Sequence, residues 1–486
     1  MIVAGAGPVG VAAATLLAQH GIACTVLDRH REPYPLPRAV HLDGAAIRVL
    51  QQIGVADAFA AISRTAAGLR LLDGRLRPFA VVDRAPTGAD GHPESALFDQ
   101  PALERLLRAN LARYPHVTLR GGVEVTGVGP GGVAVTDSGT GERQRLTAAA
   151  VLGCDGAAST VRAAIGARLR EVAAPQRWFV VDVRCPRPLP TWGGIDQVCD
   201  PRRAATFLHV TGDRYRFEFR MLPGETPQDL ARPECLGRLT APWLGDSADG
   251  RSTVLRSAGY TFRAGTADRW RHGRTLLLGD AAHLTPSFVG QGLGLGLGDA
   301  HNLAWRLAAV LRGDAGDDLL DGYERERAGH ARSVIRTAVR VGRAMTGGNG
   351  AVAALRRPMA AAVLRLPAVR AREAAAMAVH YGSRRGSDLI GTRCPQPWVH
   401  DGDVKRRLDD VLGPGFALLR SGPVAGDVLT RARVLGAREV RIGRPGITDD
   451  GTLERWLRSG RASAVLLRPD RIVMGTDRHA PWYSYR

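Results

Sequence analysis

The stretch from residue 273 to 313 joins a carboxylate to a run of glycines. Three leucines lead into Gly279-Asp280, and glycines then occupy every second position over 290–298. A buried strand at 275–278 would place Asp280 at the carboxyl edge of a sheet, where open α/β sheets bind ligands. The glycines would let backbone N–H groups approach a flat or anionic ligand closely. The competing interpretation is a flexible surface loop between a strand and a helix.

A second pattern lies near the N-terminus, where GAGPVG (5–10) follows a short apolar stretch and a later apolar stretch ends in Asp28. The glycines permit a tight turn and the close approach of a pyrophosphate to a helix N-terminus, and the acid can accept hydrogen bonds from ribose hydroxyls. A lone GxGxxG is weak evidence, but this order of strand, glycine loop, helix, strand and acid is typical of a dinucleotide site. We therefore expect strands at 2–4 and 23–27, joined by a helix that ends near His20.

A third motif, CDGAASTVR (154–162), also follows an apolar stretch. Two separate strands would thus bring Asp-Gly or Gly-Asp pairs to one face of the sheet. The segment PLPRAVH (35–41) is extended and carries one cation, Arg38. Arg38 either belongs to a proline-stiffened loop or meets a phosphate or a flavin from the side opposite the glycine loop.

These motifs need a framework of strands and helices to position them. Short strands are expected between 68 and 98 and between 121 and 135. Asp299 is expected to cap a helix that begins near it, because short acidic side chains satisfy free N–H groups of a first helical turn. The apolar face of that helix would be Leu303, Leu307 and Leu311. Further helices are expected over 43–53, 100–113 and 319–381, the last with a break at 346–350.

Residues 175–265 alternate apolar and polar residues, which predicts an antiparallel sheet inserted into the nucleotide domain. Its aromatic residues form either a platform for an aromatic substrate or ordinary core. The composition changes at residue 391, after a helical stretch. The expected fold is α/β, with a Rossmann-type nucleotide-binding domain and helical extension (1–174 and 266–390, with 68–98 adding to the substrate sheet), a substrate-binding β-sheet domain (175–265) and a C-terminal domain (391–486).

The formal charge of +19 comes from 66 basic and 47 acidic residues. The basic residues are scattered arginines, apart from Lys405, which favours compositional bias over nucleic-acid binding. The six cysteines form no CxxC pair and no metal-ligand cluster, as expected in a reducing cytoplasm. No apolar run reaches the roughly 18 residues of a membrane helix, and the N-terminus lacks the basic region of a signal peptide. We expect a cytoplasmic protein that binds no nucleic acid, membrane or metal.

The three motifs in this order resemble those of the FAD-dependent aromatic hydroxylases, the p-hydroxybenzoate and phenol hydroxylase group of flavoprotein monooxygenases. The resemblance covers essentially the whole chain. Segments at 35–43, 197–201 and 217–225, with PQPWV and LDDVLGPGF near the C-terminus, look most like 3-(3-hydroxyphenyl)propionate hydroxylases and polyketide-tailoring oxygenases, some of which serve antibiotic biosynthesis. The C-terminal region resembles their thioredoxin-like domain, which without CxxC would be redox-inert.

The resemblance implies non-covalent FAD and a place for each motif around it. The implied FAD-binding residues are Gly5, Gly7, Pro8 and Gly10 at the pyrophosphate; Asp28, with Arg29 beside it, at the adenosine ribose; Arg38 and Gln100 at the side; Val125 near the adenine; Asp155 and Gly156, shared with NAD(P)H and buttressed by Arg162; Gly279 and Asp280 at the ribityl chain; Pro286 near the reactive edge; and Gly290, Gly292, Leu293 and Gly294 at the pyrimidine end.

The implied reaction begins with reduction of FAD by NADPH or NADH. O₂ then forms a hydroperoxide at flavin C4a, which hydroxylates a small phenolic or polyketide-like aromatic substrate. A base for the phenol is not singled out, and the candidates for catalytic roles are His209, Tyr215, Arg220 and Tyr260 on the predicted sheet, with Pro286 near the flavin. His283 is interpreted as a packing and hydrogen-bonding residue rather than a proton shuttle. A homodimer is expected from the family alone.

The family pattern is not matched everywhere. Gly294 stands where these hydroxylases usually carry Asn or another small polar residue, and Gly298 and Ser287 also depart from the usual residues. A lost side-chain hydrogen bond would alter flavin mobility and the rate of reduction. Gly294 is the one feature that supports an alternative of another class, a flavin-binding protein that no longer hydroxylates. An epoxidase or a Baeyer–Villiger-type oxygenase on the same scaffold is a further alternative. A flavin-dependent halogenase is disfavoured because the chain lacks WxWxIP and its sole lysine lies in the C-terminal region.

Overall fold

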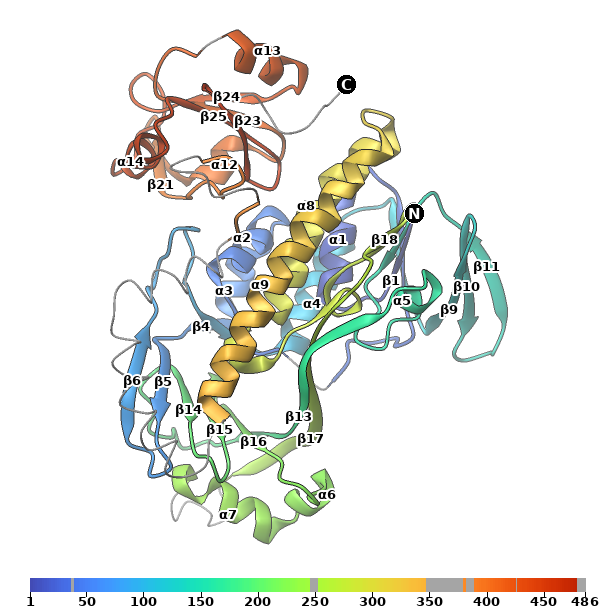
Figure 1. Ribbon diagram of the computed structural model, residues 1–486, viewed down its shortest axis with the longest axis vertical. Helices are drawn as coiled ribbons and strands as arrows, with labels where there is room; N and C mark the ends of the chain where they lie inside the picture. The colour runs from blue at the N-terminus through green and yellow to red at the C-terminus, as the bar shows by residue number, and fades with distance from the viewer. Residues whose placement is uncertain (36–38, 245–251, 347–378, 382–388, 425, 479–486) are drawn as a thin grey trace.

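The computed structural model describes residues 1–35, 39–244, 252–346, 379–381, 389–424 and 426–478. Arg38 and residues 347–378 of the expected helical stretch lie outside these ranges. The expected helical end at 379–381 was wrong, because His380 forms a β-bridge with Thr392 there. Figure 1 shows the nucleotide domain at the centre, a large β-sheet with its covering helices below it, and the C-terminal domain above it.

The nucleotide domain is built on a six-stranded sheet in the order β18-β19-β12-β1-β2-β8. All neighbours pair in parallel except β18 and β19. The central strands are almost wholly apolar, as expected where helices cover both faces of a parallel sheet. The strands confirm those predicted around the first and last motifs, to within a residue at each end. They are β1 (Ile2–Ala4), β2 (Cys24–Asp28), β8 (Val117–Gly121), β12 (Val151–Gly153), β18 (Arg271–His272) and β19 (Thr275–Leu277).

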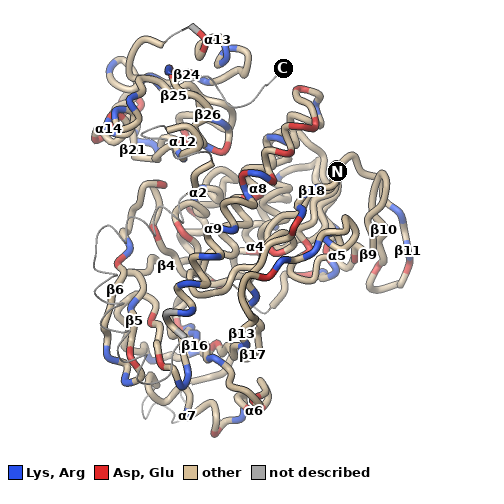
Figure 2. The backbone as a smooth tube through the Cα atoms, in the orientation of Figure 1, with Lys and Arg blue, Asp and Glu red and all other residues tan. Residues whose placement is uncertain are grey.

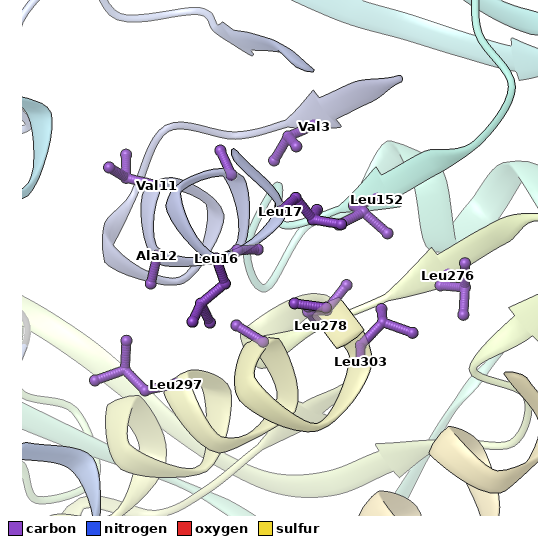
Figure 3. Packing of buried hydrophobic residues seen from close by; sticks show 14 of the residues in the cluster. Val3, Val11, Ala12, Leu16, Leu17, Leu152, Leu276, Leu278, Leu297 and Leu303 are labelled. Carbon is purple, nitrogen blue, oxygen red and sulfur yellow. The ribbon is translucent and has the colours of Figure 1, made fainter. Parts of the chain in front are cut away.

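Two helices pack together over this sheet, α1 (Pro8–Gln19) and α8 (Gly292–Arg312). Figure 3 shows Leu16 of α1 pointing toward α8, and Leu303 of α8 lying beside Leu278. The expected helices at 43–53 and 100–113 are confirmed as α2 (Gly44–Gln52) and α4 (Gln100–Leu111). The carboxylate of Asp43 caps α2 by accepting a hydrogen bond from the Ala46 amide.

The start of α8 was predicted wrongly. The helix begins at Gly292, so the glycine run is helical, and Asp299 lies inside the helix rather than capping it. Glycine costs about 1 kcal/mol in a helix relative to alanine, but here the close packing of α8 requires it. A Cβ on Gly296 would lie 2.5 Å from Val9 Cγ2 and 3.1 Å from the Cα of Gly279. Tertiary packing therefore outweighs the weak helix propensity of the run.

The second large sheet has eight strands in the order β20-β17-β13-β16-β15-β14-β5-β6. Its pairs are antiparallel apart from β14 and β5. The long strands β13 and β17 run from the nucleotide domain into this sheet (Figure 1), so the expected boundaries at 174/175 and 265/266 fall inside them. The strands are β5 (Gly68–Leu72), β6 (Pro78–Asp83), β13 (Leu169–Arg184), β14 (Ile195–Val198), β15 (Ala205–Thr211), β16 (Arg214–Arg220), β17 (Thr253–Ala267) and β20 (His283–Leu284).

The aromatic residues of β15 and β16 mostly form core on the far face of this sheet. Phe207 and Phe217 stack at 5.0 Å between ring centroids, and both lie near Trp243 of α7 (Pro233–Leu244). Tyr215 and Phe219 belong to the same buried cluster. Of the two interpretations of these aromatics, ordinary core therefore holds for this part of the sheet.

The C-terminal domain has a four-stranded sheet in the order β24-β23-β25-β26, with β23 and β24 parallel and the other pairs antiparallel. It has its own apolar core. Buried ion pairs bind it to the nucleotide domain: Arg48 Nε and Nη2 donate to the two oxygens of Asp409 at 2.7 and 2.8 Å. Arg468 Nη1 likewise donates to Glu326 at 2.9 Å. Its elements are β21 (Trp398–Asp401), β22 (Val404–Arg407), α12 (Leu408–Leu412), β23 (Ala417–Arg420), α13 (Gly426–Val434), β24 (Arg438–Arg441), α14 (Thr452–Ser459), β25 (Ala464–Leu467) and β26 (Val473–Thr476).

The remaining elements connect and cover these sheets. Figure 2 shows basic and acidic residues interspersed along the chain rather than separated into blocks. Within the described ranges, no helix combines the length and apolar character needed to cross a bilayer. The elements are β3 (His41–Leu42), α3 (Ala56–Ala61), β4 (Ser63–Thr65), β7 (Ala96–Phe98), β9 (Val123–Gly129), β10 (Gly132–Asp137), β11 (Arg143–Thr147), α5 (Thr160–Ala164), α6 (Pro227–Leu230), α9 (Asp321–Thr346) and the 3₁₀ turns 279–281, 287–289 and 317–320.

Candidate functional site

A cavity of about 2580 Å³ lies between the nucleotide domain, the eight-stranded sheet and α9, with residues 392–395 at its edge. Pockets for one small ligand usually measure about 300–1,000 Å³, so this cavity has room for a cofactor and a substrate together. Residues at the carboxyl ends of β1, β2 and β12 and at the start of α8 line it. The carboxyl edge of the sheet, where the sequence motifs predicted a ligand site, therefore forms one wall of the cavity.

The three glycines of the first loop are required for different structural reasons. Gly5 has a φ of +102°, and a Cβ on it would lie 2.3 Å from the carbonyl oxygen of Cys154. A Cβ on Gly10 would lie 2.0 Å from the carbonyl oxygen of Gly5, so Gly10 allows α1 to pack on the loop. A Cβ on Gly7 would meet nothing within 4 Å, and Gly7, like Pro8, lines the cavity. The empty space above Gly7, at the N-terminus of α1, fits a pyrophosphate.

Asp28 closes this loop from the end of β2. Its Oδ2 accepts a hydrogen bond from the Ala6 amide at 2.7 Å, and its Oδ1 accepts one from the His30 amide at 2.8 Å. Asp28 and the exposed Arg29 both line the cavity, and so does the buried Val125. Asp28 thus orders the glycine loop in addition to facing the place expected for the ribose.

Gln100 lines the cavity at the start of α4. Its Oε1 accepts a hydrogen bond from the Ala39 amide at 2.7 Å, and its Nε2 donates to Glu104 at 2.7 Å. The side-chain amide therefore fixes the backbone that follows the Arg38 segment.

The second and third motifs are joined by Arg162. Its Nη2 donates to the Ala157 carbonyl at 2.6 Å and its Nη1 to the Ala281 carbonyl at 3.0 Å. Asp155 is held by the Ser159 hydroxyl at 2.5 Å and the Val161 amide at 3.0 Å. Asp155, Gly156 and Asp280 line the cavity, whereas Arg162 and Gly279 are absent from the described residues that do so. Arg162 consequently supports the site from behind.

The first turn of α8 faces the cavity with little side chain in the way. Gly290, Gly292, Leu293 and Gly294 all line it. The N-terminus of this long helix carries a partial positive charge and free N–H groups, which suits an electron-rich ligand edge. Pro286 is buried, and the lining in the described chain runs through its neighbours Thr285 and Ser287 instead.

Behind the glycine turn lies a buried ionic network that the sequence did not reveal. Asp299 Oδ2 accepts from His283 Nε2 at 2.7 Å and from the Gly279 amide at 3.0 Å, while Oδ1 accepts from Arg327 Nε at 2.7 Å. Burial would raise the pKa of Asp299, but His283 and Arg327 outweigh it and hold this pKa below its usual value. The interpretation of His283 as a hydrogen-bonding residue agrees with these contacts.

Arg327 also explains one departure from the family pattern. Its Nη2 donates to the Leu295 carbonyl at 2.8 Å, and a Cβ on Gly298 would lie 2.9 Å from that nitrogen. Gly298 and Arg327 both line the cavity. Gly298 therefore makes room for a guanidinium that reaches α8 from α9.

The strand register separates the catalytic candidates. Tyr215 lies in the core on the far face, with its hydroxyl accepting from the Leu189 amide at 3.0 Å. His209 stacks on Tyr215 at 4.7 Å between ring centroids, and so lies on that face too. Arg220 ends β16, and among the described residues the cavity lining includes neither it nor His209 nor Tyr215. Of the four candidates on the sheet, Tyr260 lines the cavity. His209 and Tyr215 lie on the opposite face, because alternate residues of a strand face opposite sides. Arg220 shares the face of Arg216 and Glu218 but lies at the end of the strand, beyond the described lining.

The residues of β16 that do line the cavity are Arg216 and Glu218. Neither was predicted, although Arg220 of the same strand was a candidate. The signal was present in the alternation of RYRFEFR at 214–220, since charged residues at every second position must share one face. The apolar part of the same face comprises Leu69, Leu71, Val82, Val180, Ile195 and Leu208.

Comparison with known proteins places this geometry in a family. Residues 1–338 match the FAD binding domain family, and residues 391–482 match the HcaD C-terminal domain. A 3-(3-hydroxy-phenyl)propionate/3-hydroxycinnamic acid hydroxylase from Burkholderia vietnamiensis is 34% identical over 97% of this chain and 92% of its own length.

Solved structures with the same fold include two hydroxylases that match over nearly their whole length. Aklavinone-11 hydroxylase, in complex with FAD and aklavinone, has a TM-score of 0.79 at 25% identity, over 99% of this chain and 95% of that one. The OxyS anhydrotetracycline hydroxylase from Streptomyces rimosus has a TM-score of 0.79 at 26% identity, over 98% and 94%. With a glycine loop that fits a pyrophosphate and relatives matched over the full length, the chain belongs to the FAD-dependent aromatic hydroxylase family and is a flavin-dependent monooxygenase.

Proposed function

We propose that this enzyme hydroxylates a small phenolic or polyketide-like aromatic compound with NAD(P)H and O₂. The observation that carries the proposal is the continuity of the cavity. One continuous space joins the glycine loop and the first turn of α8 to a sheet face that carries both apolar and polar side chains. A flat ring with a hydroxyl group matches that face, next to the place where the FAD-binding motifs converge.

The protein's part in this reaction is to bind, orient and exclude water. FAD supplies the activation of O₂ and the transfer of one oxygen atom when it is bound and reduced. The loop at Gly7 and the carboxylates of Asp155 and Asp280 would hold the cofactor, and the N-terminus of α8 favours negative charge at its pyrimidine end. Leu71 and Leu208 on the sheet face would keep water away from the reacting ring.

Several finer features belong to the same proposal. We propose NADPH or NADH as the reductant and a homodimer on the basis of the family, and a cytoplasmic location on the basis of the unpaired cysteines. A role in antibiotic biosynthesis is supported by the likeness to hydroxylases of aklavinone and anhydrotetracycline. A thioredoxin-like C-terminal domain is supported by its sheet order, in which a parallel β-α-β unit is extended by an antiparallel hairpin.

The test is oxidation of NADPH and NADH by the purified FAD-loaded enzyme, with and without single phenols. The panel contains 3-(3-hydroxyphenyl)propionate, 4-nitrophenol and a dihydroxyanthraquinone, which represent the ring systems accepted by relatives or suited to the cavity. We expect at least one phenol to stimulate oxidation and to gain one oxygen atom, traced with ¹⁸O₂. Oxidation that is indifferent to every phenol and yields only H₂O₂ would refute the proposal.

A further inference from the structure

Glu218 occupies the middle of the sheet face that lines the cavity. Its direct cross-strand neighbours are Val180 on β13 and Thr206 on β15, and all three residues line the cavity. Directly opposed residues in antiparallel strands project to the same side of a sheet. Gln197 follows as the partner of Thr206 on β14. Glu218 therefore lies on the cavity face of the sheet between apolar Val180 and polar Thr206.

A cationic cluster stands beside Glu218. Arg216, two residues earlier on β16, donates from Nε and Nη2 to the two oxygens of Asp182 at 2.7 and 3.2 Å. Arg256 donates from Nε to Asp182 at 2.9 Å. Two guanidinium groups thus share one carboxylate, which leaves the trio with a net charge of +1. Glu218 Oε1 lies 3.8 Å from Arg216 Nη1, farther than a hydrogen bond reaches.

The surroundings of Glu218 make its carboxylate a stronger base than an ordinary one. The titratable and charged groups facing it are Arg216 on its own strand, Asp182 on β13, and Arg256 and Tyr260 on β17. Burial is the largest influence and raises the pKa of Glu218; Arg216 and Arg256 oppose this rise and Asp182 adds to it. A carboxyl with a raised pKa is better matched to a phenol, whose pKa is about 10, than an ordinary carboxylate is.

We propose that Glu218 is the base of the reaction proposed above, accepting the proton of the substrate's aromatic hydroxyl. The substrate O–H bond breaks, a new O–H bond forms on the Glu218 carboxylate, and the electron pair stays on the phenolate oxygen. The net positive charge of Arg216, Asp182 and Arg256 balances the phenolate. Loss of the proton makes the ring richer in electrons and so more reactive toward an electrophilic oxygen. This inference rests on the proposed function.

The test compares Glu218→Gln with the wild-type enzyme, using 3-(3-hydroxyphenyl)propionate and its ring-fluorinated analogues, which are more acidic phenols. We expect Glu218→Gln to keep its FAD but to form hydroxylated product about 10²–10³-fold more slowly at neutral pH. The deficit should shrink steadily as the phenol becomes more acidic, because an acidic phenol needs no base. A residue with a purely structural role would not produce that dependence.

Two further variants control the experiment. Glu234→Gln removes the same charge from an exposed position of α7, beyond the far face of the sheet. This variant should form hydroxylated product at the wild-type rate. Glu218→Asp keeps a carboxylate and should regain part of the rate and the wild-type insensitivity to phenol acidity; if it does no better than Glu218→Gln, the proposal is overturned.

The outcomes separate this inference from the proposed function. Wild-type enzyme that hydroxylates none of these phenols refutes the proposed function for this substrate class, and the role of Glu218 falls with it. Active wild-type enzyme together with a Glu218→Gln variant that is equally fast, or slower by one constant factor for every phenol, overturns the role of Glu218 alone.

Discussion

Asp299, in the interior of helix α8, accepts a hydrogen bond from His283 at 2.7 Å, and both side chains are fully buried. The same carboxylate accepts from Arg327 and from the Gly279 amide. One residue therefore ties α8 to the Gly-Asp turn and to α9. This carboxylate therefore supports the glycine-rich first turns of α8 from the side away from the cavity.

Replacing Asp299 with Asn should destabilise the protein by about 3–5 kcal/mol, because it leaves the guanidinium of Arg327 buried without its counter-charge. Denaturant-induced unfolding followed by fluorescence would measure the loss. Asp314→Asn, which changes an exposed acid paired with Arg312 just beyond the end of α8, is the control and should change the midpoint little. Equal midpoints for Asp299→Asn and the wild type would contradict the structural role of Asp299.

The glycine loop offers a matched pair of substitutions. Gly7→Ala places a methyl group in open space within the cavity, so the protein should fold but bind FAD weakly. Gly10→Ala would drive a Cβ into the Gly5 carbonyl at 2.0 Å, so this variant should lose stability first. Flavin absorbance per protein and the unfolding midpoint separate the two effects. A Gly7→Ala protein with full FAD would mean that the pyrophosphate does not lie over this residue.

Asp280 provides the corresponding test at the other motif. Its carboxylate lines the cavity at the end of the β19 strand, where it would meet hydroxyl groups of the ribityl chain. Asp280→Ala should therefore be purified largely without FAD. Full flavin content and turnover in this variant would show that the cofactor site is placed wrongly.

Gly294 tests the departure from the family pattern. A Cβ there would meet Gln291 Oε1 at 3.4 Å, Ala46 Cβ at 3.6 Å and Asp43 Oδ1 at 3.7 Å, which are ordinary contacts. Gly294→Asn should therefore fold and keep FAD while changing the rate of flavin reduction, measured by stopped-flow absorbance. A misfolded or FAD-free variant would contradict the open space beside Gly294.

The docking of the C-terminal domain should depend on pH through Asp409. Burial would raise the pKa of Asp409, but Arg48 and Arg471 outweigh it and lower this pKa to about 2 from an ordinary 3.8. The ion pair therefore stabilises the fold fully above about pH 4, and its contribution of about 2 kcal/mol is lost as pH falls toward 2. Asp409→Asn should lower the unfolding midpoint at neutral pH and weaken its acid dependence. If the unfolding midpoints of the variant and the wild type fell in parallel with pH, Asp409 would not be the source of the acid dependence.

The local chemistry of the motifs was predictable because glycine spacing and strand-terminal acids depend on short-range geometry. The sequence accordingly predicted β1, α1, β2 and the strand before Asp280. The start of α8 was not predictable from local preference, since Gly296 is helical only because Val9 and Gly279 pack against it.

The face of the sheet on which a side chain lies was harder to predict than the position of its strand. The alternation in β16 groups Arg216 with Glu218 on one face and the aromatic residues on the other. Residues of both faces are buried, so the alternation does not show which face borders the cavity and which packs against α7. Tyr215 and Glu218 lie on the same strand, yet Tyr215 is core and Glu218 lines the cavity. Only the pairing of β16 with β13 and β15 reveals which residues meet a ligand.

The most direct test of the central claim is the amount of hydroxylated product formed per NAD(P)H consumed by the FAD-loaded wild-type enzyme with the phenol panel. The structure predicts that at least one phenol accelerates NAD(P)H oxidation and that most of the reducing equivalents appear in a product carrying one atom from ¹⁸O₂. Oxidation at the same rate with and without every phenol, with H₂O₂ as the only product, would contradict assignment of this cavity to aromatic hydroxylation.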